Sequence, residues 1–291
     1  MNGAERRPAS LVEGEFVFTA QDFAKISAML YADAGISLPE SKATLVYSRL
    51  AKRLRSLGLE NFRAYCALVA GEDGLDERQN MLAALTTNVT RFFREPHHFE
   101  HLKAHLLPGL LDEARTGGKV RLWSAACSNG QEPYSIALTI LSLLPDAGRY
   151  DIKILATDID PNMVAEGRAG VYDRSAADSI PADLRRRWCS PVAGPRGEAV
   201  GMNDEVRALV AFRELNLIGP WPMAGKFQAI FCRNVVIYFD EPTQSRLWSR
   251  FTPLLTPNGR LYIGHSERLC GEAAARFDTD GITTYRLRGP A

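Results

Sequence analysis

The sequence WSAACSNGQEPYS (123–135) places a loop of small residues between a short apolar run and an apolar helical pattern. Small side chains let a ligand approach the backbone closely at the end of a parallel strand. The small residues of this loop are Ala125, Ala126, Ser128 and Gly130. The loop lacks the G-x-G-x-x-G spacing of a dinucleotide pyrophosphate site, which argues against NAD. Glu132, which starts the helix, either complements the helix dipole or fixes a cationic ligand group.

The segment ATDID (156–160) ends the next apolar run in carboxylates. A carboxylate about 20 or more residues beyond such a loop commonly accepts hydrogen bonds from both hydroxyls of a ribose, and Asp158 suits that role. Asp160 precedes Pro161 and fits a helix N-cap better. An unphosphorylated ribose without a pyrophosphate indicates S-adenosylmethionine (SAM) as the ligand.

A further strand exit, FCRNVVIYFD (231–240), brings an amide and a phenol to the same predicted edge. Asn234 has one acceptor and two donors, which suit the carboxylate and ammonium of an amino acid. Tyr238 could form an aromatic or hydroxyl wall beside a sulfonium. Packing in the core is the plainer interpretation of Tyr238 when this segment is taken alone.

The segment NVTRFFREPHHFE (88–100) precedes the predicted sheet and is rich in aromatic and charged residues. Arg91, Arg94 and Glu95 exceed what a linker requires, so we expect a lid over the ligand, contributed by the edge of a preceding domain. Four histidines follow closely, and they are His97, His98, His101 and His105. Neither a third-ligand carboxylate nor an HExxH pattern accompanies them, so a solvated helix face is favoured over a metal site.

Basic residues gather between residues 41 and 63, where Glu60 is the one acidic residue. Lys42, Arg49 and Arg53 fall close together on one face of the helix predicted there. Taken alone, such a stripe indicates a solvated face. Opposite a protein substrate that presents carboxylates, it would be a docking surface.

The composition is that of an ordinary globular protein. The chain has 291 residues, of which 46% are hydrophobic and 24% charged, and a net charge of +1. These values exclude collagen, coiled-coil rods and disordered tails, and they give no bulk charge that would attract nucleic acid or membranes. The polar N-terminus, the lack of a long apolar run and five cysteines without a CxxC predict a cytoplasmic protein with no signal peptide and no membrane insertion.

Residues 19–90 predict a small helical domain that follows a flexible N-terminal segment, residues 1–18. Thr19 with Asp22 resembles a capping box at the start of the first helix, which Gly35 ends. Further helices are expected at about 41–57, 61–70 and 76–85.

Beyond residue 118 strand and helix patterns alternate, which predicts a doubly wound parallel α/β sheet in a domain that spans 91–291. The alternation breaks at about 186–214, where short strand patterns between Gly and Pro turns predict a small β insertion. The C-terminal ITTYRLR (282–288) is expected to form an antiparallel edge strand.

Together these segments resemble the CheR family of chemotaxis receptor methyltransferases. The motifs that carry the resemblance are TRFFRE (90–95), WSAACSNGQEPYS (123–135), ATDID (156–160), LNL (215–217), FCRNVVIYFD (231–240) and GHSE (264–267). They occur in the order and spacing of the family and cover about residues 19–287. Asn129 and Gln131 depart from the residues common in the family, whereas Glu132 is kept.

The resemblance implies a SAM-dependent, Rossmann-like methyltransferase domain with an N-terminal all-helical domain and an inserted antiparallel β-subdomain. It implies methyl transfer from SAM to glutamate side chains on the cytoplasmic helices of chemoreceptors, which gives γ-glutamyl methyl esters and S-adenosyl-L-homocysteine. No metal and no nucleic-acid partner are implied, and a monomer is expected. In some family members the β-subdomain captures the C-terminal pentapeptide of a receptor by strand addition.

Carried over motif by motif, the resemblance also implies site residues. The cofactor pocket would comprise Asn88, Thr90, Arg94, Glu132, Asp158, Asn216, Leu217, Asn234 and Val235. Arg94 and Tyr238 would face the transferred methyl and the incoming carboxylate. The substrate-docking residues would be Lys42, Arg49 and Arg53. A glutamate carboxylate has a reference pKa of about 4.3, so the transfer needs alignment and exclusion of water rather than a general base.

Several alternatives stand beside this interpretation. A CheR-like methyltransferase could serve a non-chemotaxis pathway, and a non-catalytic module could sense SAM in signalling. The incomplete glycine fingerprint disfavours an NAD-dependent oxidoreductase. A nucleic-acid methyltransferase would need a broader basic surface and a DPPY- or NPPY-like motif, which the sequence lacks.

Overall fold

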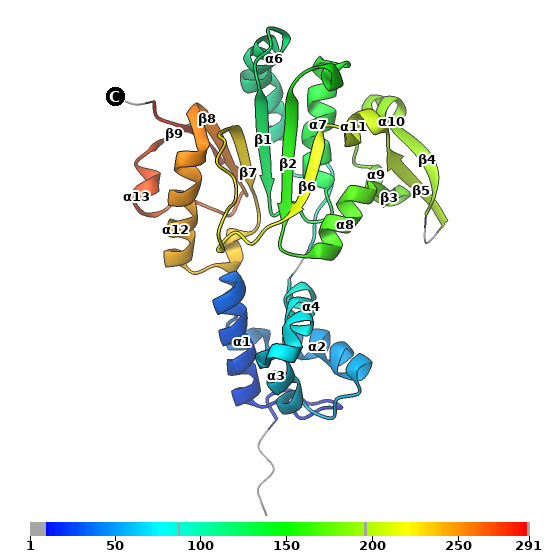
Figure 1. Cartoon of the computed structure of the whole chain (residues 1–291), viewed down its shortest axis with the longest axis vertical. Coiled ribbons are helices and arrows are strands. Elements are labelled where there is room, and N and C mark those ends of the chain that lie inside the picture. The colour runs from blue at the N-terminus through cyan, green and yellow to red at the C-terminus, as the bar shows by residue number, and fades with distance from the viewer. Residues whose placement is uncertain (1–9, 87, 195–196, 290–291) are drawn as a thin grey trace, which may run out of the picture. The chain divides into compact units, whose positions relative to one another are not determined.

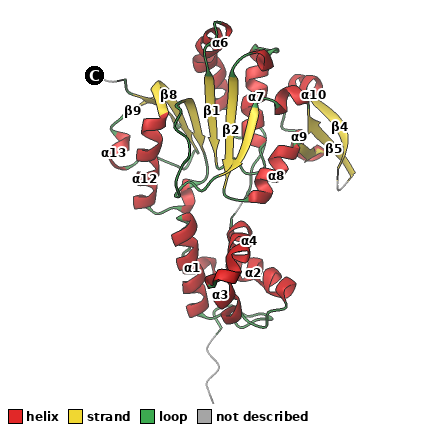
Figure 2. Cartoon of the chain, viewed as in Figure 1, coloured by secondary structure: helices red, strands yellow, loops and turns green. Residues whose placement is uncertain are grey.

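The computed structural model describes residues 10–86, 88–194 and 197–289, and the chain divides into two compact units, 1–87 and 88–291. The first unit is built from helices, whereas the second combines two β-sheets with helices (Figures 1 and 2). The division falls before the predicted boundary at residue 90, so Asn88 and Thr90 belong to the second unit. The predicted origin of the lid segment in the helical domain is therefore wrong.

Residues 10–86 of the first unit contain four α-helices: α1 Ala20–Ala34, α2 Ala43–Leu57, α3 Phe62–Ala70 and α4 Leu75–Leu85. The predicted capping box is present, because the Thr19 side chain accepts from the Asp22 N–H and the Asp22 carboxylate accepts from the Thr19 N–H. Gly35 ends α1 in the left-handed conformation that its lack of a Cβ permits, with φ of 70°. The apolar face of α1 is fully buried at Ile26 and Leu30.

The segment before α1 corrects one prediction. The Phe18 side chain is fully buried, with its ring centroid 4.3 Å from that of Phe62. The backbone N–H of Phe16 donates to the Tyr47 hydroxyl at 3.0 Å. Residues 10–18 are thus packed rather than flexible, because two aromatic side chains bury enough apolar area to offset the entropy of ordering a short segment. Residues 1–9 of the predicted flexible segment lie outside the described residues.

A seven-stranded sheet in the order β6-β2-β1-β7-β8-β10-β9 forms the centre of the second unit (Figure 1). Its strands are β1 Val120–Ala125, β2 Ile152–Asp158, β6 Val210–Glu214, β7 Phe227–Cys232, β8 Leu255–Ile263, β9 Phe277–Gly281 and β10 Thr284–Leu287. The first five in spatial order run parallel, and β10 pairs antiparallel with both β8 and β9. Strand order reverses at β1, which confirms the doubly wound α/β fold.

The helices of the second unit precede β1 or lie between strands of its two sheets. They are α5 His97–His101, α6 Leu107–Arg115, α7 Gln131–Leu143, α8 Pro161–Ala169, α9 Arg174–Ala177, α10 Ala182–Trp188, α11 Asp204–Arg207, α12 Glu241–Phe251 and α13 Gly271–Ala274. The core includes fully buried aromatic residues of the central strands, such as Phe231, whose ring stacks on Tyr262 at 4.2 Å between centroids. None of the described helices combines the length and the apolar character that a membrane crossing requires.

The C-terminal strand is antiparallel as predicted, but it is not at the edge. β10 lies between β8 and β9, and β9 forms the edge. The sequence FDTDG of β9 alternates poorly between apolar and polar residues, so it carries no strand signal of its own. Pairing with β10 across the turn at 282–283 makes it a strand.

The β insertion is a separate antiparallel sheet, in the order β3-β5-β4, which lies on the β6 side of the large sheet in Figure 1. Its strands are β3 Val171–Asp173, β4 Cys189–Gly194 and β5 Gly197–Met202. The predicted span 186–214 is therefore wrong at both ends, since it misses β3 and includes β6. β6 pairs in parallel with β2, with Val210 beside Ile154. A short strand pattern does not reveal its partner, and tertiary packing decided it here.

Candidate active site

The carboxyl ends of β6, β2, β1 and β7 meet at one edge of the large sheet, and the segments that follow β1 and β7 contain non-glycine residues with positive φ. Of the seven non-glycine residues with positive φ that the structure describes, five lie in the segments that meet at this edge. They are Phe93, Glu95, Ala126, Ser128 and Asn234. Sparsely populated backbone conformations persist where surrounding contacts hold them, commonly at functional sites. This edge is also where ligands of doubly wound sheets bind.

Backbone N–H groups of the β1 loop and of the turn after β2 bind the carboxylate at the end of β2. The Ser128 N–H donates to Asp158 Oδ2 at 2.7 Å, and the Asp160 N–H donates to Asp158 Oδ1 at 3.0 Å. Each oxygen keeps a lone pair, which is what a ribose diol requires. Burial raises the pKa of Asp158 to about 6. Gly130 completes the loop at φ of 92°, where a Cβ would lie 2.9 Å from the Phe212 ring.

Asp160 caps a helix, as its sequence context predicted. Its Oδ1 accepts from the Asn162 N–H at 2.9 Å at the start of α8. Its Oδ2 accepts from Asn88 Nδ2 at 3.2 Å. The Ser128 hydroxyl donates to the Asn88 carbonyl at 3.4 Å. The lid segment is thereby bonded to both the β1 loop and the end of β2.

A buried arginine connects the lid segment to α7. The Arg233 side chain is only 1% exposed, and its Nη1 donates to Glu132 Oε2 at 3.0 Å. Its Nη2 donates to the Arg94 carbonyl and lies 3.5 Å from Glu95 Oε2. Glu132 also accepts from the Ser124 hydroxyl at 2.7 Å. Burial raises the pKa of Glu132 and Arg233 opposes that shift, so Glu132 is paired with a cation of the chain itself.

The two predicted catalytic side chains lie on different segments of this edge. Arg94 is partly exposed, and its Nη1 donates to the Val89 carbonyl at 2.9 Å, which closes the lid segment on itself. Tyr238 ends a short 3₁₀ turn, Val236–Tyr238, beyond β7 and is partly exposed. Tyr238 is therefore not one of the fully buried core residues. Asn234 links the two segments, since its Nδ2 donates to Glu95 Oε1 at 3.4 Å.

The LNL segment follows β6 and is held from α12. Arg250 donates to the carbonyls of Leu217, at 2.7 Å, and Gly219, at 2.5 Å. Its guanidinium lies 3.8 Å from the centroid of the Trp221 ring, and the Trp221 Nε1 donates to the Asn216 carbonyl at 3.3 Å. These contacts fix the backbone of the loop that carries Asn216 and Leu217, and the Leu217 side chain is buried.

Comparison with protein families matches both units. Residues 88–286 match the family described as "CheR methyltransferase, SAM binding domain", and residues 21–86 match "CheR methyltransferase, all-alpha domain". The chain belongs to the CheR methyltransferase family. SAM is accordingly the cofactor. Each oxygen of the Asp158 carboxylate accepts one hydrogen bond from a backbone N–H, and this acceptor-only group fits the ribose hydroxyls of SAM.

Relatives of this CheR-family chain carry matching names. It is 59% identical to a "Probable chemotaxis protein methyltransferase" of Rhizobium etli over 89% of this chain and 96% of that protein. It is 46% identical to "Chemotaxis protein methyltransferase 2" of Pseudomonas aeruginosa, over 93% and 94% of the two chains. The identity to the "Chemotaxis protein methyltransferase" of Escherichia coli is 42%, over 91% and 90%.

Three residues of this edge were missed by the sequence reasoning. They are Arg233, Arg250 and Glu267. Arg233 and Glu267 lie inside the quoted motifs FCRNVVIYFD and GHSE, directly beside apolar strand patterns. A charge in that position is rarely buried without a partner, and this was the available signal. Apart from Gly264, which is three residues from Glu267, their partners lie more than 30 residues away in sequence and could not be named from it.

Two of the four histidines near the lid segment, His98 and His101, are bound to other side chains rather than solvated. His98 is fully buried, and its Nε2 lies 2.9 Å from the Thr283 hydroxyl, while burial lowers its pKa to about 3. His101 lies 3.1 Å from the Tyr262 hydroxyl. The predicted solvated helix face is therefore wrong for these two residues. Both bind the β8–β10 end of the large sheet to the start of the α5–α6 region.

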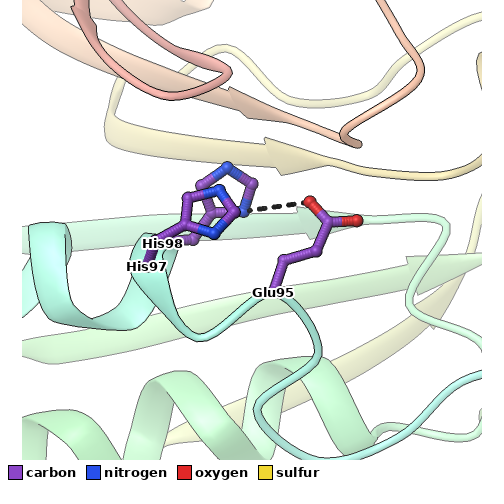
Figure 3. A group of neighbouring side chains, drawn as sticks. All are labelled: Glu95, His97 and His98. Atoms are coloured by element: carbon purple, nitrogen blue, oxygen red, sulfur yellow. Dashed lines mark ion pairs between the residues drawn. The ribbon is translucent and has the colours of Figure 1, made fainter.

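Glu95, His97 and His98 bring three potential metal ligands within 4.8 Å of one another, and Figure 3 shows the carboxylate facing His98. The dashed contact in the figure is 3.7 Å long. The same carboxylate oxygen lies 3.5 Å from the Arg233 guanidinium. A divalent cation there would be repelled by that guanidinium with about 4 kcal/mol per unit charge at 4 Å and an effective dielectric of 20. The charge balance thus favours the ion pair over a metal.

The predicted docking residues of α2 have unequal environments. Arg49 Nη1 donates to the carbonyls of Leu85, at 2.9 Å, and Thr86, at 2.7 Å, at the end of α4. Arg53 forms a two-point ion pair with the buried Glu77, with 3.0 Å between Nε and Oε1. Lys42 is exposed. Two of the three predicted docking residues therefore bind groups within the helical unit.

Proposed function

We propose that this CheR-family protein transfers the methyl group of SAM to glutamate side chains of chemoreceptors and forms γ-glutamyl methyl esters. The main support is the Asp158 carboxylate, which backbone N–H groups fix at the point where the strand order of the sheet reverses. This sheet lies within the residues that match the family's SAM-binding domain. The names of the relatives support chemotaxis as the setting. A non-chemotaxis role has no comparable support.

The chemistry requires alignment more than acid or base catalysis. SAM, when bound, supplies a methyl group on a positively charged sulfur. A carboxylate oxygen of the substrate forms the new bond to that methyl as the methyl–sulfur bond breaks, and the electron pair of that bond stays on sulfur. The positive and negative charges cancel in the reaction. Excluding water from the site therefore strengthens the attraction that brings the two groups into line.

Arg94 suits the incoming carboxylate. Its guanidinium has five N–H donors, and the one described hydrogen bond, to the Val89 carbonyl, leaves donors available. Planar two-point binding of a carboxylate is a property of guanidinium groups. The hydrogen bond from Arg233 to the Arg94 carbonyl fixes the backbone beneath this side chain. Tyr238, on the exit of β7, is assigned to positioning the methyl group.

The cofactor pocket follows from the same edge. Asp158 binds the ribose hydroxyls, and Glu132, paired with Arg233, faces the amino-acid end of the cofactor. The walls come from the lid segment, the LNL segment and the β7 exit. The remaining assigned residues are Asn88, Thr90, Arg94, Asn216, Leu217, Asn234 and Val235. Contacts that already fix Asn88 to Asp160 and Asn234 to Glu267 support a preformed pocket.

Two surfaces are assigned to the receptor. Because receptor methylation sites are themselves carboxylates, an exposed cation such as Lys42 on the basic face near α2 suits docking. In the β-subdomain, β4 pairs with β5 alone among the described residues, so its other edge is open to an extended pentapeptide. The protein would act as a cytoplasmic monomer that binds the cytoplasmic helices of the receptor.

The test is methyl transfer from labelled SAM to a purified cytoplasmic receptor fragment. We expect base-labile label, released as methanol, and its loss when the receptor glutamates are replaced by alanine. Arg94→Ala should lower turnover at saturating SAM by about 100-fold, comparable to the loss of one charged positioning group. SAM binding without any base-labile product would contradict the proposed activity and favour a SAM-sensing module.

A further inference from the structure

The GHSE motif ends in a buried carboxylate that no step of the reaction uses. Glu267 lies beyond β8 and is 4% exposed. Its Oε2 accepts from the N–H groups of Gly264, at 2.5 Å, and Asn234, at 3.0 Å. Its Oε1 accepts from the Val236 N–H at 3.0 Å. One side chain thus holds three backbone amides, two of which belong to the exit of β7.

The exit of β7 needs the hydrogen bonds that Glu267 accepts, because its backbone is unusual. Asn234 has φ of 60°, a left-handed conformation that a residue with a Cβ rarely adopts. Such a residue persists only where its surroundings hold it. An ionised carboxylate is an acceptor alone and forms charge-assisted bonds to N–H groups, so it suits this task.

Gly264 shows how closely the two segments approach. A Cβ at this position would lie 2.5 Å from Asn234 Nδ2, 2.8 Å from the Asn234 N and 2.8 Å from Glu267 Oε2. The backbone of Gly264 is not in the left-handed region, so space alone excludes a larger residue here. The exit of β7, the GHSE motif and the Glu267 carboxylate therefore form one close-packed unit.

We propose that Glu267 is a positioning residue for the cofactor pocket, which sets the backbone that presents Asn234, Val235 and Tyr238. This inference rests on the proposed assignment of those residues to the SAM pocket. Glu267 does not contact the reacting atoms in this role. It determines where the β7 exit places the groups that do.

Glu267→Gln tests the inference. The amide has nearly the same shape but replaces one acceptor oxygen by a donor that faces backbone N–H groups. We expect the SAM dissociation constant to rise at least tenfold at a temperature well below the unfolding midpoint. Hydrogen exchange at the Asn234 and Val236 amides should become faster while the amides of β7 keep their protection. Turnover at saturating SAM should also fall, because Tyr238 follows the same backbone.

A matched control separates this effect from a general loss of stability. Asp22 is also a buried carboxylate that accepts from a backbone N–H, that of Thr19 at 3.0 Å in the helical unit. Asp22→Asn should lower the unfolding temperature and leave the SAM dissociation constant unchanged. A purely structural role of Glu267 would give the same pattern in Glu267→Gln.

Gly264→Ala provides a second test that keeps the carboxylate and decides the matter if Glu267→Gln does not fold. It should weaken SAM binding and expose the same amides, whereas Gly148→Ala, whose Cβ would meet nothing within 4 Å, should do neither. The inference on Glu267 would be overturned if folded Gly264→Ala and Glu267→Gln bound SAM with wild-type affinity while Asn234→Ala bound it more weakly. The pocket assignment would stand in that case. Wild-type affinity in Asn234→Ala would instead contradict the pocket assignment on which it rests.

Discussion

The carboxyl edge of the large sheet and the basic face of α2 both looked functional as patterns of charged residues, yet they use charge differently. At the sheet edge, Asp158 and Glu267 accept hydrogen bonds from backbone N–H groups. On α2, Arg49 and Arg53 donate to groups of the same helical unit. The backbone donors orient Asp158 for a ligand and let Glu267 hold the exit of β7, whereas part of the hydrogen-bonding capacity of the two arginines is used within the helical unit.

The largest test of this contrast is Asp158→Ala. Losing two hydrogen bonds to a charged acceptor, each worth about 1.5–3 kcal/mol, should raise the SAM dissociation constant by about 100-fold or more. Calorimetric titration with SAM and S-adenosylhomocysteine measures it. Asp112→Ala, which removes an exposed acid of the same unit, should bind both ligands normally. A change below threefold in Asp158→Ala would remove the central assignment of the pocket.

Arg53→Ala tests whether α2 is structural. Glu77 would be left buried without its cation, and we expect the free energy of unfolding to fall by about 2 kcal/mol, below the usual 3–5 for a fully buried pair because Arg53 is partly exposed. Urea unfolding measures the change. Lys52→Ala, next to it and exposed, should stay within about 0.5 kcal/mol of the wild type. Equal stability of the two variants would contradict a structural role for Arg53 and favour its predicted role in docking.

The pH dependence of SAM binding sharpens the role of Asp158. Its pKa is raised to about 6 by burial, so the protein without ligand holds a protonated Asp158 below that pH. Only the ionised form accepts from both ribose hydroxyls, and SAM affinity should therefore fall about tenfold per pH unit below 6. The same raised pKa favours folding at low pH, and that contribution is lost as pH rises through about 6. A pH-independent affinity in titrations from pH 7 to 5 would contradict this account.

The smallest expected effect is that of Lys42→Ala. An exposed cation at the rim of an interface contributes about 0.5 kcal/mol, so the KM for a receptor fragment should rise about twofold. Raising the salt concentration should remove the difference, because exposed charges are screened. The dissociation constant for SAM should not change. A large, salt-independent rise in KM would indicate a direct structural role for Lys42 instead.

Much of this protein could be determined from the sequence alone, wherever the physics is local. The capping box of Thr19, the end of α1 at Gly35 and the N-cap role of Asp160 each depend on residues within a few positions. The alternation of strand and helix patterns indicated the doubly wound sheet. The order and spacing of the motifs indicated the family, and five of the six motifs lie at or just beyond the end of a strand.

Tertiary structure alone decided which groups bind one another. The bonds of Arg233 to Glu132 and of Glu267 to Asn234 join residues from different strand exits. The same holds for the partner of β6, the interior place of β10 and the burial of Phe18. The type of a charged or apolar residue indicates that it needs a partner when it is buried. Which partner it receives depends on packing across long sequence separations, and a local pattern carries no information on that choice.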